Sequence, residues 1–170
     1  MVQNIDSGRV DFLERLKEIT ETAVKDLILP TRIQKEGEEP GFRAPDVYLM
    51  RLPDSKSATK KAPYIIHTLL TGMDQQAEGN PVESTVKVRT IFCVYNNDEQ
   101  EGGLALLGVM ERLRIHLLRH TVIGERYRLD LTTGMEALVY PDDTAPYFAG
   151  EMMSTWRIPS IEREVRQWLQ

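Results

Sequence analysis

Three histidines and one cysteine are the side chains whose types could supply a nucleophile, a general base or a metal ligand. His116 and His120 lie four residues apart, which would place both on one face of a helix. The residues between them are two leucines and an arginine, so the glutamate of an HExxH zinc site is missing and a cation sits beside the would-be metal. We therefore predict that both histidines lie at the polar C-terminal end of a helix, where positive charge is favoured.

His67 and Cys93 have apolar neighbours in the sequence. His67 falls in the middle of an expected strand, which favours a packed or sheet-edge side chain over a catalytic one. Cys93 stands between Phe92 and Val94, so we expect it to be buried as a small hydrophobic residue. A single cysteine also excludes an internal disulfide framework and a zinc site made of CxxC pairs.

Phosphate-binding and carboxylate motifs are equally weak. Gly102-Gly103 precede an expected helix, but neither GxxxxGK[ST] nor GxGxxG is present, and nearby acids such as Glu101 would repel a phosphate. Asp142-Asp143 fall in a proline-flanked turn, where acids are common for conformational reasons. The sequence therefore predicts no catalytic residues, no metal site, no bound cofactor and no enzymatic activity.

Length and composition are those of a globular chain. The 170 residues, with 41% apolar and 28% charged side chains, fit a single domain over 1–170. The formal net charge of −5 argues against bulk electrostatic attraction to nucleic acid or anionic lipid. The first residues lack the apolar stretch of a signal peptide, and no apolar run approaches the ~18 residues of a membrane-spanning helix.

Apolar periodicity predicts the order α-β-β-β-α-β-β-β. An amphipathic helix is expected over 7–29, a loop over 31–45, polar segments over 54–61 and 72–83, and a C-terminal amphipathic tail over 161–169. Between them, residues 46–158 are expected to form a sheet plus a central helix, with strands over 46–52, 64–70, 84–95, 126–132, 135–140 and 150–158 and a helix over 104–120. This order predicts an α+β fold, a mainly antiparallel sheet with helices on one face and long polar loops.

The central helix and the last strand carry the largest apolar side chains. One side of the helix is expected to bury Leu106, Leu107, Met110, Leu113, Leu117 and Leu118. The run Pro146–Gly150 and Trp156 flank the last strand, and two interpretations are open for their aromatic rings. They anchor the strand to the core, or some of them line a subunit interface, where aromatic residues and arginine are enriched.

A resemblance covers about two-thirds of the chain, from about Val47 onward. The residues that carry it are Ala62–Ile66, Val86–Val88, Val94–Asn96, Met110–Leu118 (MERLRIHLL), Pro146–Gly150, Trp156, Ile158–Pro159 and Ile161–Glu164. In layout these segments resemble the tail terminator and tail-completion (neck) proteins of long-tailed bacteriophages. The first helix and residues 31–45 have no counterpart that we can align.

The resemblance implies a virion structural protein made in the bacterial host cytoplasm. Such a subunit would form a ring, commonly a hexamer, that caps the tail tube, stops its polymerisation and joins it to the head-completion or connector protein. It would use no cofactor, contact no membrane and let genomic DNA pass without specific binding. Six copies at −5 each would give an acidic ring, along which DNA would slide.

A closed ring of identical subunits needs two different surface patches on each subunit. We expect one patch on the polar segments 54–61 and 72–83, and the other on the last strand near 150–157, acting as a sheet edge. The interface residues proposed on this basis are Asp54, Lys56, Lys60, Lys61, Met73, Gln75, Gln76, Tyr147, Phe148, Glu151, Trp156 and Arg157.

Other functions stay open at this point. A different neck component or a tail-tube subunit would have the same general features. A small α+β hydrolase built on His67 or His116 with a carboxylate is a second class. A monomeric adaptor that binds a peptide along an exposed sheet edge is a third.

Overall fold

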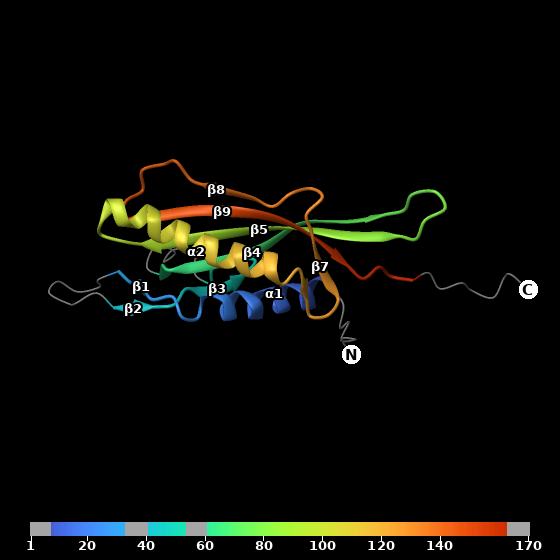
Figure 1. Ribbon diagram of the computed structural model, residues 1–170, viewed down its shortest axis with the longest axis horizontal. Coiled ribbons are helices and arrows are strands. Elements are labelled where there is room, and N and C mark those ends of the chain that lie inside the picture. The colour runs from blue at the N-terminus through green and yellow to red at the C-terminus, as the bar shows by residue number, and fades with distance from the viewer. Residues whose placement is uncertain (1–7, 33–40, 54–60, 163–170) are drawn as a thin grey trace, which may run out of the picture.

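The computed structural model describes residues 8–32, 41–53 and 61–162, and it has the predicted α+β architecture (Figure 1). Two helices, α1 (Arg9–Val24) and α2 (Glu99–Arg119), accompany one large sheet and a small two-stranded one. The strands are β1 (Leu29–Pro30), β2 (Phe42–Arg43), β3 (Asp46–Leu49), β4 (Tyr64–Gln75), β5 (Glu83–Tyr95), β6 (Val122–Ile123), β7 (Tyr127–Asp130), β8 (Glu136–Val139) and β9 (Tyr147–Ile158).

The large sheet is mainly antiparallel, as predicted. Its strand order is β3-β4-β5-β9-β7-β6, and β8 pairs with β9 beyond the end of β7. Only the β3–β4 pair is parallel among the described strands. The long strands β4, β5 and β9 form its centre, where β5 pairs with β9 from Ser84↔Ile158 to Tyr95↔Tyr147.

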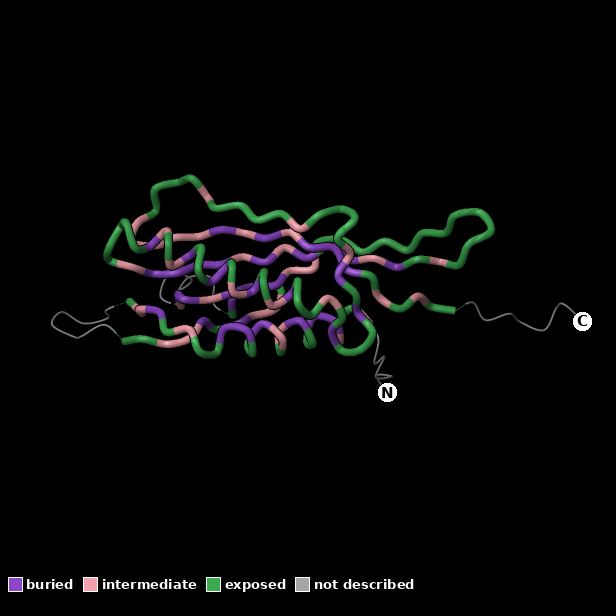
Figure 2. Tube along the Cα trace, in the orientation of Figure 1, coloured by how far each residue is buried: buried purple, intermediate pink, exposed green. Residues whose placement is uncertain are grey.

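Both helices cover one face of this sheet (Figures 1 and 2). Side chains alternate along β5, and its even-numbered apolar residues, such as Val88 and Phe92, are buried beneath the helices. Phe12 of α1 and Leu113 of α2 lie fully buried in the same core. The sheet therefore has a helix-covered face and an opposite face, which we call the open face.

Helix α2 begins at Glu99, five residues earlier than predicted. The carboxylate of Asp98 accepts hydrogen bonds from the backbone N–H groups of Gln100 and Glu101, at 3.0 and 3.3 Å. This N-cap explains why an acidic, glycine-containing segment is helical, because it binds backbone donors that the first turn leaves free. Leu107 and Leu118, which were expected in the core, are exposed on α2.

Helix α1 ends at Val24, earlier than the predicted end near residue 29. The N–H of Leu27 donates to the carbonyl oxygen of Val24, closing a tight turn that ends the helix. The chain then continues into β1, where Leu29 is buried and pairs with Arg43 of β2.

Strand β4 continues through Gly72 to Gln75, so the prediction of a flexible segment over 72–83 was too long. The β4–β5 register shifts between Leu69 and Thr71 and then continues to the pair Gln75↔Glu83. The two strands form a hairpin whose end extends beyond the helices (Figure 1) and is exposed there (Figure 2). We call residues 70–83 the arm.

The contact between α2 and β9 depends on a glycine. A Cβ built on Gly102 would lie 2.0 Å from the ring of Phe148, whereas one on Gly103 would meet nothing within 4 Å. We expect Gly102→Ala to lower the free energy of unfolding by about 1–3 kcal/mol through overpacking. Gly103→Ala is the matched control and should raise it by about 0.5–1 kcal/mol, because alanine favours a helix. Urea denaturation measures both, and equal effects at the two positions would contradict this packing.

Candidate functional site

The predicted interface residues divide into three groups. Asp54, Lys56 and Lys60 lie outside the described residues. Lys61 is half-buried beside the fully buried Ala62. The remaining predicted residues lie on the arm and on β9.

The arm presents the predicted residues to solvent. Met73 is 58% exposed, and Gln75 is also exposed at the end of β4. Gln76 follows the strand and donates its side-chain amide to the backbone carbonyl of Asn80, at 3.0 Å. Arg9 of α1 lies beside Gly72 and 3.6 Å from Asp74, so the base of the arm is held against the body.

The predicted residues of β9 lie on both faces of the sheet, because successive side chains of a strand point to opposite faces. Tyr147, Glu151 and Arg157 share the open face, whereas Phe148 and Trp156 point toward the helices. Trp156 is 0% exposed, so its assignment to an interface is wrong for this subunit and its ring anchors the core. Phe148 is half-buried against Gly102.

Strand β9 is not a sheet edge, which corrects the prediction for residues 150–157. Its side opposite β5 pairs with β7 from Arg128↔Arg157 to Asp130↔Thr155. It then pairs with β8 from Glu136↔Met153 to Val139↔Gly150. The sequence missed this arrangement, because the polar turn residues between the last three predicted strands do not reveal which strands pair.

Several strand edges lack a strand partner within the described part of the chain, including the outer sides of β3 and β6 at the two ends of the sheet; two others, on β8 and β4, are longer or more exposed. All four residues of β8 are exposed, and the strand pairs only with β9. On the other side of the sheet, β3 covers β4 only from Tyr64 to His67, which leaves the rest of β4 without an outer neighbour. The free side of β8 and the uncovered part of β4 therefore lie on opposite sides of one sheet.

Ion pairs order the open face between these edges. The guanidinium of Arg89 donates to Glu151 and, at 2.9 Å, to the hydroxyl of Tyr140. These hydrogen bonds raise the pKa of Arg89. At the other end of β9, Arg157 lies 3.3 Å from Asp130 and 3.6 Å from Glu83. Hydrogen bonds from Thr132, followed by Arg157, lower the pKa of Asp130.

A second, smaller core lies where Tyr95 and Tyr147 meet, with ring centroids 5.4 Å apart. Ala62 and Cys93 are buried in it, which confirms the expected burial of the cysteine, and burial raises the pKa of its thiol. The hydroxyl of Tyr147 is buried without a hydrogen-bond partner in the described structure.

Removal of that hydroxyl should stabilise the isolated subunit. An unsatisfied buried hydroxyl costs about 1–3 kcal/mol, so we expect Tyr147→Phe to raise the free energy of unfolding by about 1 kcal/mol. Tyr95→Phe is the control, because the Tyr95 hydroxyl donates to Asn97 at 2.8 Å and its loss should destabilise. Thermal unfolding compares them, and a destabilising Tyr147→Phe would show that the hydroxyl has a partner.

His67 is fully buried between two threonines. Its Nε2 lies 2.8 Å from the hydroxyl of Thr20 and its Nδ1 lies 2.8 Å from that of Thr90. Thr20 already donates to the carbonyl of Leu16 at 2.7 Å, so Nε2 carries the proton and donates to Thr20, while Nδ1 accepts from Thr90. Burial lowers the pKa of His67 to about 3. The predicted packed role is confirmed, and no substrate can reach this ring.

His116 and His120 lie at the end of α2 with ring centroids 4.7 Å apart. His120 is the C-cap and donates its N–H to the carbonyl of His116, as their predicted position at the helix end requires. Partial burial, then His120 and Arg119, lower the pKa of His116. The described residues contain no group of three or more side chains that could hold a metal ion.

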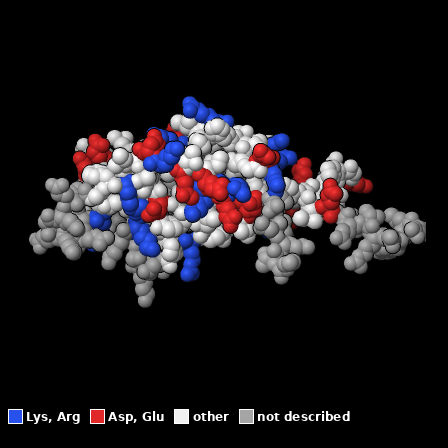
Figure 3. Space-filling model, turned by 90° about the horizontal axis from the view of Figure 1, so that it is seen from below, with Lys and Arg blue, Asp and Glu red and all other residues white. Residues whose placement is uncertain are grey.

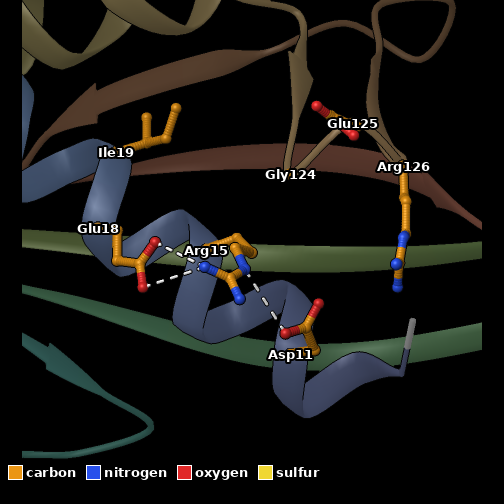
Figure 4. Close-up of a pocket in the computed structure, with 7 residues that line it drawn as sticks. All are labelled: Asp11, Arg15, Glu18, Ile19, Gly124, Glu125 and Arg126. Carbon is orange, nitrogen blue, oxygen red and sulfur yellow. Dashed lines mark hydrogen bonds and ion pairs between the residues drawn. The ribbon is translucent and has the colours of Figure 1, made fainter. Parts of the chain in front are cut away.

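A cavity of about 630 Å³ lies between α1 and the turn from β6 to β7 (Figure 4). Arg15 lies 3.0 Å from Glu18 and 3.6 Å from Asp11, and Tyr127 donates to Asp11 at 2.5 Å. Burial, followed by the bond to Asp11, raises the pKa of Tyr127. The charged side chains bind one another along α1, and the hydroxyl of Tyr127 links Asp11 of this helix to β7.

Charges of both signs are interspersed on the surface that includes α1 (Figure 3). This mixture is typical of a solvated face and does not form one continuous basic patch in that view. No helix among the described residues has the length and apolar character needed to cross a membrane.

No protein-family model matches the chain, and no curated protein sequence matches it. Function must therefore be argued from the surface geometry.

Proposed function

We propose that this protein is a ring-forming subunit of a phage virion, a tail terminator that caps the tail tube and joins it to a head-completion or connector protein. The observation that supports it best is that β8 and the outer part of β4 are free strand edges on opposite sides of one sheet. The edge of β4 beyond His67, with the arm, is one patch, and β8 is the other.

Free edges favour assembly because each presents a row of backbone donors and acceptors that a further strand can satisfy. Neighbours that join β4 of one subunit to β8 of the next would use two different patches, as a closed ring requires. Met73 on the arm and Leu138 on β8, 58% and 49% exposed, would contribute apolar area to this contact.

In this function the chain acts through surfaces and needs no catalytic group. With a net charge of −5 per subunit, the ring is acidic, which suits a channel that DNA crosses without binding. Its location is then the neck of the virion, with the tail tube on one side and the connector on the other.

Two variants test the contact. One replaces residues 75–83 by Asn-Gly, which joins the paired residues Asp74 and Ser84 through a two-residue hairpin turn, and also carries Met73→Lys, which places charge on the β4 edge that remains. The other is Leu138→Lys/Val139→Lys, which places charge on the β8 edge. Each variant should lose the ring by light scattering, while circular dichroism should show that it remains folded.

An equal mixture of the two variants gives the sharper result. Each retains the patch that the other lacks, so the mixture should form a complex that contains both variants and that neither forms alone, and no ring. The control replaces Glu78 and Asn80 at the exposed arm tip by serine and should keep the ring. A ring that survives both edge variants would overturn this contact.

A monomeric adaptor is the second candidate, because the same β8 edge could pair with a peptide strand. A chain that stays monomeric at high concentration and ignores purified tail tubes would favour it over the ring.

A further inference from the structure

Helix α2 is apolar on two opposite sides. Its buried side, which includes Leu106, Leu113 and Leu117, faces the sheet. On the side turned away from the core, four large apolar residues remain exposed by 37–65%; they are Leu104, Leu107, Ile115 and Leu118. We call these four the outer stripe. Figure 2 shows exposed positions recurring along α2.

The outer stripe is symmetric about Glu111. Leu107 and Ile115 lie four residues before and after it, and Leu104 and Leu118 lie seven residues before and after it. Spacings of four and seven keep all five side chains on one side of a helix. An antiparallel second copy would therefore place Leu104 opposite Leu118, Leu107 opposite Ile115, and Glu111 at the centre.

The charged side chains at the centre of the outer stripe would also complement the same side chains of a second copy. Arg114 lies 3.3 Å from Glu111 of its own helix, and both side chains are about half exposed. In the antiparallel pair, both copies of Glu111 lie at the centre. Each Arg114 then lies three residues along the helix from its own Glu111 and equally far along the helix from the Glu111 of the second copy. Two carboxylates and two guanidinium groups would then alternate around the axis, which fixes the register.

We propose that the outer stripe pairs with the same stripe of a second copy across a two-fold axis at Glu111. This contact is isologous, so it differs from the ring contact, which joins unlike edges. It joins two subunits face to face, whether these are free or belong to two rings. It neither requires the ring nor follows from it.

Single-cysteine crosslinking tests the geometry in a Cys93→Ser background, which removes the one native cysteine. At the two-fold axis Glu111→Cys should form a disulfide-linked dimer under mild oxidation, because the two Cα atoms come within the ~7 Å that a disulfide spans. Leu104→Cys is the matched control. Position 104 lies about 10 Å along the helix from the axis, so its two copies are about 20 Å apart and should not crosslink.

A mixture of Leu104→Cys with Leu118→Cys chains should crosslink, because those positions face each other. Efficient crosslinking of Leu104→Cys with itself would indicate a parallel or random contact and would overturn the proposal. Absence of crosslinking at position 111, in a variant whose circular dichroism shows that it is folded, would also overturn it. Dimers are read on a denaturing gel, so failure here is distinct from loss of the ring, which is read by light scattering.

Discussion

Replacement of Trp156 by alanine is expected to lower the free energy of unfolding by about 3–5 kcal/mol. The side chain is 0% exposed, and its ring lies 5.4 Å from that of Phe12, which joins β9 to α1. Its indole N–H donates to the hydroxyl of Ser154 at 2.9 Å, so the variant loses a satisfied polar contact as well as buried volume. Urea denaturation at neutral pH measures the change.

Arg157→Ala is the matched control, because it changes the next residue on the same strand, whose side chain points to the open face. Exposed ion pairs such as those of Arg157 with Asp130 and Glu83 contribute about 0–1 kcal/mol. A loss below about 1.5 kcal/mol for Trp156→Ala would contradict the core assignment of the ring.

The second large effect is a loss of stability in mild acid caused by His67. Its pKa is lowered by burial to about 3 from the ordinary 6.5, so the folded protein keeps the ring neutral while the unfolded chain takes up a proton below pH 6.5. The contribution of the neutral His67 ring to the free energy of unfolding is thus complete above pH 6.5 and is lost as the pH falls toward 3. Between pH 7.5 and pH 5 we expect this residue alone to cost about 2 kcal/mol.

The comparison that isolates His67 uses the variant His67→Gln. Other groups also titrate between pH 5 and pH 7.5, so the relevant quantity is the difference between the two proteins in how unfolding free energy varies with pH. The variant should lose about 2 kcal/mol less than the wild type over this interval. Parallel curves would show that the folded protein protonates His67 as readily as the unfolded chain.

The fold class followed from periodicity, because period-2 and period-3.6 patterns are local. Val86, Val88 and Phe92 alternate along β5 as a one-face strand requires, and Phe12 and Leu16 repeat at helical spacing in α1. The predicted ends of the helices were wrong where a single hydrogen-bonded contact sets the end of the helix. The Asp98 cap extended α2 into an acidic segment that is typical of turns.

The candidate site was less predictable, because strand pairing is not local. The exposure of Met73 and Gln75 could be predicted from the polar surroundings of the arm. The position of β8 between β9 and solvent could not be predicted. Residues 126–158 contain three strand signals, and the sequence does not define which of these strands pair with each other. Exposed Leu138 and Val139 on a short strand were the available signal.

The mass of the native chain by light scattering on a sizing column, over a range of concentrations, tests the ring most directly. A ring of six 19.5 kDa subunits would have a mass of about 117 kDa, and the variant with the shortened arm would show no species of ring size. We expect both results, with rings in negative-stain images of the leading peak. A native chain that stays at 19.5 kDa at every concentration and does not cap added tail tubes would contradict the account.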